Sequence, residues 1–181
     1  MCMGSQADFF GGYDFKAQAG IVHLANHHIA PGNKQWTWGN HEFGYAWDRN
    51  LSAADARGEF SPYIEIMSGV YTDNQPDFSF LQPGETKSWS QYWYPIQKVG
   101  PVQHANLPAA VSLQLGARRF RIGVCVTRAI PSAVIRLESF ENGFRAAEWD
   151  ADLGPGQPFV LDSRQARKPW KIGHTTLRVF D

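Results

Sequence analysis

Apolar and polar residues alternate along much of this chain, whereas the three-and-four spacing of an amphipathic helix is rare. Gly and Pro recur between the alternating segments and divide them into short runs. We therefore predict an all-β protein. The segments with the clearest strand character are residues 20–26, 34–38, 62–67, 86–93, 109–115, 119–127, 133–140, 157–161 and 175–180.

One segment departs from this pattern. In residues 51–58, Ser52 is placed to cap a helix and Gly58 to end it, which predicts a single helical turn within a loop. A second break lies at residues 100–108, where Trp-rich sequence gives way to plainer alternation. We therefore expect two parts, residues 1–104 and a small β-sandwich over residues 105–181.

Charge and cysteine content limit the partners. Seventeen basic and seventeen acidic side chains cancel, and no apolar run reaches the roughly 18 to 20 residues of a bilayer span. We expect neither a nucleic-acid nor a membrane partner. Cys2 and Cys125 are the only cysteines, and no secretory signal begins the sequence. Free thiols of this kind are typical of a reducing compartment, so we expect a cytoplasmic protein.

A carboxylate lies in the middle of the strand predicted over residues 62–67. Alternation sends Ile64 and Ile66 to one face and Tyr63, Glu65 and Met67 to the other. The Glu65 side chain would then project from the sheet beside an aromatic ring, as a carboxylate does in a sugar-binding groove. An ordinary exposed strand Glu has the same appearance, so both interpretations stay open.

Aromatic residues are concentrated before this strand. Alternation places Trp36 and Trp38 on one face, where they either pack into a core or stack on a sugar ring. His41 follows in a polar turn that could satisfy sugar hydroxyls.

A polar loop follows the same strand. It carries Gln75 and Asp77, whose planar hydrogen-bonding groups suit vicinal hydroxyls. The spacings of zinc and calcium sites are absent, as are a nucleophile elbow and a phosphate-binding Gly loop. We expect no metal and no cofactor.

Several motifs carry a family resemblance, which covers about residues 9–96. The chain resembles an uncharacterised bacterial domain of the galactose mutarotase-like (aldose epimerase-like) superfamily, often joined to tetratricopeptide repeats. The segments that carry the resemblance are Ala-Gly-Ile-Val-His at 19–23, Pro-Gly-Asn-Lys-Gln-Trp-Thr-Trp-Gly at 31–39, Tyr-Ile-Glu-Ile-Met-Ser-Gly at 63–69, Asn-Gln-Pro-Asp-Phe at 74–78 and Trp-Tyr-Pro-Ile at 93–96.

The resemblance implies a β-supersandwich and a carbohydrate ligand. In aldose epimerases a late strand carries a Glu general base, followed by a Pro-Asp loop and a Leu-x-Pro-Gly-Glu turn. Glu65, Pro76-Asp77 and residues 81–85 match this order. The chain is shorter than a supersandwich, and its histidines do not match the family's acid histidine. It therefore resembles the C-terminal part of such a protein, a partial supersandwich that could be inactive alone.

The resulting hypothesis is sugar binding in a groove, with acid/base chemistry at the anomeric carbon in the manner of a mutarotase or a glycoside hydrolase. Glu65 would be the catalytic residue, and a second carboxylate would be needed for hydrolysis. The alternatives are a non-catalytic carbohydrate-binding module and a structural β-domain beside a helical repeat. The residues expected to bind the sugar are Trp36, Trp38, His41, Tyr63, Gln75 and Asp77.

Overall fold

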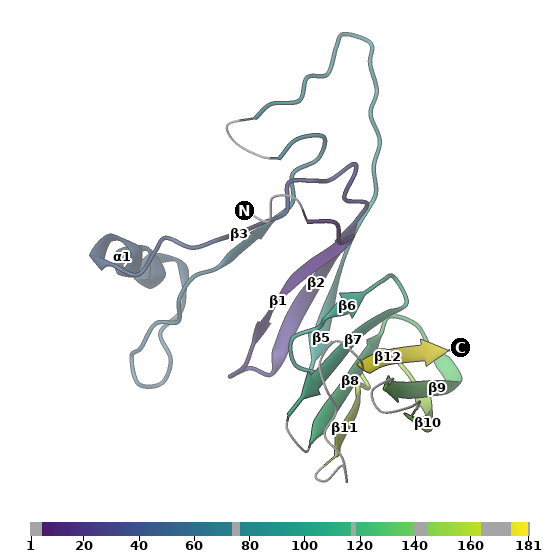
Figure 1. The fold of residues 1–181 in the computed structure, drawn as a ribbon. Helices are drawn as coiled ribbons and strands as arrows, with labels where there is room; N and C mark the ends of the chain where they lie inside the picture. The colour runs from purple at the N-terminus through teal and green to yellow at the C-terminus, as the bar shows by residue number, and fades with distance from the viewer. Residues whose placement is uncertain (1–4, 74–76, 117–118, 140–144, 164–174, 181) are drawn as a thin grey trace. The chain divides into compact units, whose positions relative to one another are not determined.

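The structure is a computed structural model that describes residues 5–73, 77–116, 119–139, 145–163 and 175–180. It consists mostly of β-strands with one short helix, which confirms the predicted all-β class (Figure 1). The chain forms two compact units. The first comprises Met1–Asp8 and Ala25–Ser90, and the second Phe9–Leu24 and Gln91–Asp181. The expected division into a partial supersandwich over residues 1–104 and a small β-sandwich over residues 105–181 stays a prediction.

Among the described residues the second unit contains three sheets. In strand order they are β1 (Phe9–Asp14), β2 (Ala19–Ala25) and β5 (Gln91–Gln97); β11 (Phe159–Ser163), β8 (Phe120–Val126), β7 (Ala109–Leu115) and β6 (His104–Ala105); and β10 (Arg145–Leu153), β9 (Ile130–Ser139) and β12 (Thr175–Phe180). The pairs β1–β2, β6–β7, β7–β8, β8–β11, β9–β10 and β9–β12 are antiparallel. Figure 1 shows β7, β8 and β11 side by side, with β9, β10 and β12 in a neighbouring layer.

The strand β8 shows how sequence alternation builds a sandwich-like core. Phe120, Ile122 and Val124 point to one face and pack with residues of β9 and β10. Cys125 points to the opposite face and packs with residues of β2 and β5. Because β8 is buried on both faces, it requires small residues where chains approach closely. Gly123 meets this need, since a Cβ there would lie 2.6 Å from the side chain of Val99.

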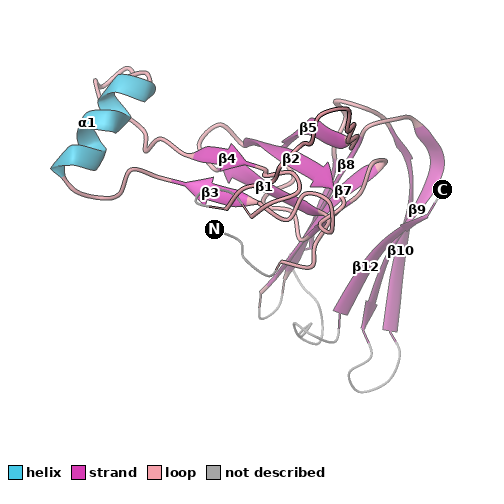
Figure 2. Cartoon of the chain, turned by 90° about the horizontal axis from the view of Figure 1, so that it is seen from above, coloured by secondary structure: helices cyan, strands magenta, loops and turns pink. Residues whose placement is uncertain are grey.

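The first unit has little regular structure. Its elements are β3 (Lys34–Trp36), the helix α1 (Glu42–Leu51) and β4 (Glu65–Met67). Strands β3 and β4 form a two-stranded antiparallel ribbon, and Figure 2 shows α1 within the connection that joins them. Mutual backbone hydrogen bonds between Gly32 and Gly69 extend this pairing beyond the strands.

The prediction of a single helical turn at residues 51–58 was wrong. The helix instead occupies Glu42–Leu51 and ends where the turn was expected to begin. Ser52, expected at an N-terminus, caps the C-terminus: its backbone N–H and its hydroxyl both donate to the Asp48 carbonyl. Within the described ranges this ten-residue helix is the only one, and it is too short and too polar to serve as a transmembrane segment.

Most of the predicted strands are present, but the one over residues 86–93 was misplaced. The strand β5 begins at Gln91 and continues through Pro95. It is an edge strand of its sheet, which is where a proline without an amide N–H is tolerated. The sequence interpretation also missed β1, β6 and β10. The expected free, buried thiol is confirmed at Cys125, whereas Cys2 lies outside the described residues.

Candidate functional site

The β3–β4 ribbon brings two of the predicted site residues together. Trp36 lies directly opposite Glu65 in the antiparallel register. Directly opposite residues project from the same face of a sheet, so the indole and the carboxylate share one face. Lys34 and Met67, two residues along each strand, belong to that face as well. The indole of Trp36 stays 41% exposed, which leaves it available to a ligand.

The Tyr63 hydroxyl completes this group by hydrogen bonding to the Glu65 carboxylate. Partial burial raises the pKa of Tyr63, and the hydrogen bond and negative charge of Glu65 raise it further. The phenol therefore stays protonated at neutral pH and acts as a donor. The arrangement agrees with the alternation that placed Tyr63 and Glu65 on one face. We call Trp36, Tyr63 and Glu65 the ribbon face.

The helix α1 fixes the approach of the chain to β4. The Asp48 carboxylate accepts a hydrogen bond from the backbone N–H of Tyr63 at 2.9 Å. The Ser52 hydroxyl shares its one hydrogen between the Asp48 carbonyl and the Ser61 carbonyl, the latter also at 2.9 Å. Two side chains near the end of the helix thus hold residues 61–63, and the position of the Tyr63 phenol depends on them.

A cluster of aromatic rings joins the helix to β3. Trp38 and Trp47 stack with ring centroids 4.5 Å apart and planes 13° apart. Trp36 meets Trp38 at a right angle, with centroids 6.0 Å apart. Because Trp47 covers one face of Trp38, the half-buried Trp38 is a supporting ring, and the more exposed Trp36 is the ring that a ligand can reach.

A close backbone approach makes this aromatic packing feasible. Gly44 lies in the first turns of α1, and a Cβ there would come within 2.1 Å of the Gly39 carbonyl oxygen. Only glycine permits this distance, so Gly44 lets the helix lie against the loop that carries Trp38.

The remaining predicted residues lie differently. His41 is exposed at the start of α1, with its ring stacked on Phe43 at 6.3 Å, and Phe43 in turn contacts Trp38. Asp77 is exposed, and among the described residues no contact joins it to the ribbon face. Gln75 lies outside the described residues. The structure therefore gathers Trp36, Trp38, Tyr63 and Glu65, with His41 at the margin.

Two residues of the candidate site, Lys34 and Asp48, were missed by the sequence interpretation. The Lys34 ammonium lies 5.5 Å from the centre of the Trp36 ring, a cation–π contact that places positive charge at the ribbon face. The sequence did contain a signal for this contact, because Lys34 lies two residues before Trp36 in a predicted strand and such residues share a face. Asp48 had no such signal, because its role depends on the helix. No group of three or more potential metal ligands lies within the part of the chain that the structure describes.

Two family models match the chain, one after the other along the sequence. Residues 1–96 match the family described as a domain of unknown function, DUF5107. Residues 104–181 match the family described as the second domain of YphG-like proteins. No solved structure matches the chain. Since the first match covers more than half of the 181 residues and includes the whole ribbon face, the chain belongs to the DUF5107 family.

Proposed function

We propose that this chain binds carbohydrate at the ribbon face. The observation that carries the proposal is the cross-strand pairing of the exposed Trp36 with Glu65, together with the Tyr63 hydroxyl on that carboxylate. A sugar offers an apolar ring face and a rim of hydroxyl groups. The ribbon face presents the complementary pair, an indole for stacking and a carboxylate with a phenol for hydrogen bonding.

The surroundings favour a neutral sugar lying over the indole. Lys34 already places a cation near the Trp36 ring, and it can donate to a sugar oxygen when a ligand arrives. Glu65 carries two oxygens and about four acceptor positions, of which Tyr63 uses one, so acceptor capacity remains for hydroxyls. His41 lies close enough to the aromatic cluster to bind a larger ligand at its margin.

Binding without catalysis is the form of the proposal that the geometry supports best. Acid/base chemistry at the anomeric carbon requires a second ionisable side chain that acts as the general acid while Glu65 acts as the general base. Among the described residues the hydrogen-bonded neighbour of Glu65 is Tyr63, whose raised pKa makes it a weak acid. Membership of the galactose mutarotase-like superfamily, a neighbouring tetratricopeptide region and a cytoplasmic location remain parts of this proposal, which rest on the sequence alone.

The first experiment measures sugar binding by isothermal titration calorimetry and Trp fluorescence, with galactose, glucose and short oligosaccharides as ligands. Replacing Trp36 by Ala removes the stacking surface, worth about 1–2 kcal/mol, so Kd should rise roughly five- to thirtyfold. Trp89→Ala is the matched control, because Trp89 is similarly exposed in the same unit but contacts Tyr71 instead. A wild-type protein that binds none of these sugars contradicts the proposal.

The second experiment separates binding from catalysis. Glu65→Gln keeps an acceptor oxygen for Tyr63 but removes the negative charge, so binding should weaken severalfold without being lost. Mutarotation of α-galactose is followed by polarimetry in the same samples. If wild type accelerates mutarotation and Glu65→Gln does not, Glu65 is a catalytic residue. Rates that equal the uncatalysed rate with both proteins support the binding module.

A further inference from the structure

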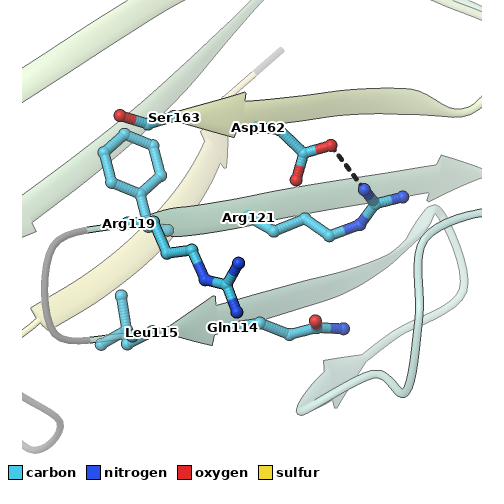
Figure 3. Close-up of a pocket in the computed structure, with 8 residues that line it drawn as sticks. Gln114, Leu115, Arg119, Arg121, Asp162 and Ser163 are labelled. Atoms are coloured by element: carbon cyan, nitrogen blue, oxygen red, sulfur yellow. Dashed lines mark hydrogen bonds and ion pairs between the residues drawn. The ribbon is translucent and has the colours of Figure 1, made fainter. Parts of the chain in front are cut away.

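A cavity of about 490 Å³ lies in the second unit, and its lining shares no residue with the ribbon face. It sits at the end of the four-stranded sheet where β7 turns into β8, and its volume is in the range of small-molecule sites. Its main lining residues are Gln114, Leu115, Arg119, Arg121, Asp162 and Ser163. Figure 3 shows the polar side chains of Gln114, Arg119, Arg121 and Asp162 on strands of this sheet, together with Leu115 and Ser163.

The register of the sheet builds one side of this cavity. Gln114, Arg121 and Asp162 are direct partners across β7, β8 and β11, so their side chains project from one face in a row. Arg121 is already engaged: it forms an ion pair with Asp162 and donates to the Lys98 carbonyl at 2.9 Å. Asp162 therefore neutralises Arg121 and holds it in place.

Arg119 differs from Arg121 in its partners. No described acid or carbonyl pairs with its guanidinium, which lines the same cavity in Figure 3. Gly116 leaves space for the stem of this side chain, since a Cβ there would lie 3.1 Å from the Arg119 Cγ. With Arg121 and Asp162 cancelling, the described lining keeps one uncompensated positive charge on Arg119.

We propose that this cavity binds a small hydroxylated monocarboxylate, such as a sugar acid. The Arg119 fork suits a carboxylate, which it can meet with two parallel hydrogen bonds. Gln114 and the half-exposed Asp162 carboxylate, which project from one face of the sheet, offer donors and acceptors for hydroxyl groups. Asp162 disfavours a second negative charge on the ligand.

Titration calorimetry on the full chain tests this assignment with D-gluconate and D-glucuronate as probes. We expect saturable binding of at least one of the two that weakens with added salt. Arg119→Gln should raise the Kd of the bound sugar acid about tenfold or more, because a charged hydrogen-bonding partner is lost. The Kd of the Arg119→Lys variant should lie between those of wild type and Arg119→Gln. Arg57→Gln is the control, since Arg57 is exposed on a turn of the other unit, and it should leave Kd unchanged.

Two results would overturn the assignment. One is the absence of saturable binding of both sugar acids to wild type. The other is an Arg119→Gln variant that binds them as wild type does. The ribbon face is tested separately: Trp36→Ala should leave sugar-acid binding intact, and any binding of neutral glucose should be insensitive to Arg119→Gln. Failure of one site is therefore distinguishable from failure of the other.

Discussion

Replacing Gly44 by Ala is the sharpest test of how α1 is held against the loop that carries Trp38. Two effects of this substitution oppose each other. In a helix interior, Ala is favoured over Gly by about 1 kcal/mol, so propensity alone predicts a more stable protein. The new Cβ would meet the Gly39 carbonyl oxygen at 2.1 Å and the Trp38 carbonyl oxygen at 2.9 Å, far inside the 3.4 Å where ordinary contacts begin.

The steric clash should outweigh the gain in helix propensity, so that Gly44→Ala lowers the stability of the protein. Both contacted atoms are backbone, so they cannot rotate away as a flexible side chain would, and overpacking of this kind costs about 1–3 kcal/mol. We expect a net loss of stability of roughly 1–2 kcal/mol once propensity is offset. The stacked Trp38–Trp47 pair should separate as the helix shifts.

Urea unfolding followed by Trp fluorescence measures the loss of stability, and near-ultraviolet circular dichroism reports the Trp38–Trp47 stack. Asn50→Ala is the matched control, because Asn50 is exposed in the same helix and only propensity changes there. That variant should gain a few tenths of a kcal/mol. A Gly44→Ala protein that is as stable as wild type, with its Trp signal unchanged, refutes the close approach.

Three further predictions concern the second unit. Gly123→Ala should destabilise by about 1–3 kcal/mol in urea unfolding, because the new Cβ would overlap Val99 between two sheets; an unchanged midpoint contradicts this packing. Burial lowers the pKa of His23 from 6.5, so the unfolded chain binds a proton at a higher pH than the native protein does. The stability that the neutral His23 imidazole contributes is complete above pH 6.5 and falls as the pH drops towards the lowered native pKa. Wild type should therefore lose more stability than the His23→Gln variant between pH 7.5 and 5.5. Equal losses in the two proteins contradict the burial argument. Burial also raises the pKa of the Cys125 thiol, so in a Cys2→Ser background iodoacetamide should label the native protein far more slowly than the urea-unfolded chain, and equal rates count against a buried thiol.

Period-two alternation predicted much of the fold because it reports local burial. The strands over residues 109–115 and 175–180 have the predicted bounds, since apolar and polar residues alternate along most of each segment, from Val111 to Leu115 and from Thr176 to Val179. The strand β10 was missed because three of its residues are Ala, which gives little hydrophobic signal. The helix α1 was missed because Gly44 reads as an interruption, although it is the residue that permits the helix to pack.

The candidate site was less predictable because its geometry is not local. Alternation placed Tyr63 and Glu65 on one face, whereas the spacing of two between Lys34 and Trp36 was overlooked. Neither pattern can reveal that Trp36 lies opposite Glu65, since cross-strand register depends on how the connecting segment closes. The expectation that both Trp36 and Trp38 stack on a ligand treated them as equivalent, whereas the helix brings Trp47 onto one face of Trp38.

The helical insertion is what distinguishes Glu65 from an ordinary strand carboxylate. Without α1, a three-residue pairing of β3 with β4 would be marginal, since a two-stranded ribbon has little independent stability. With α1, the Asp48 carboxylate fixes the Tyr63 backbone, and the Tyr63 hydroxyl then bonds to Glu65. The helix also places Trp47 behind Trp38, which meets Trp36 edge to face. Both sides of the ribbon face are therefore positioned by one element, and a disturbance of α1 should affect the stacking ring and the carboxylate together.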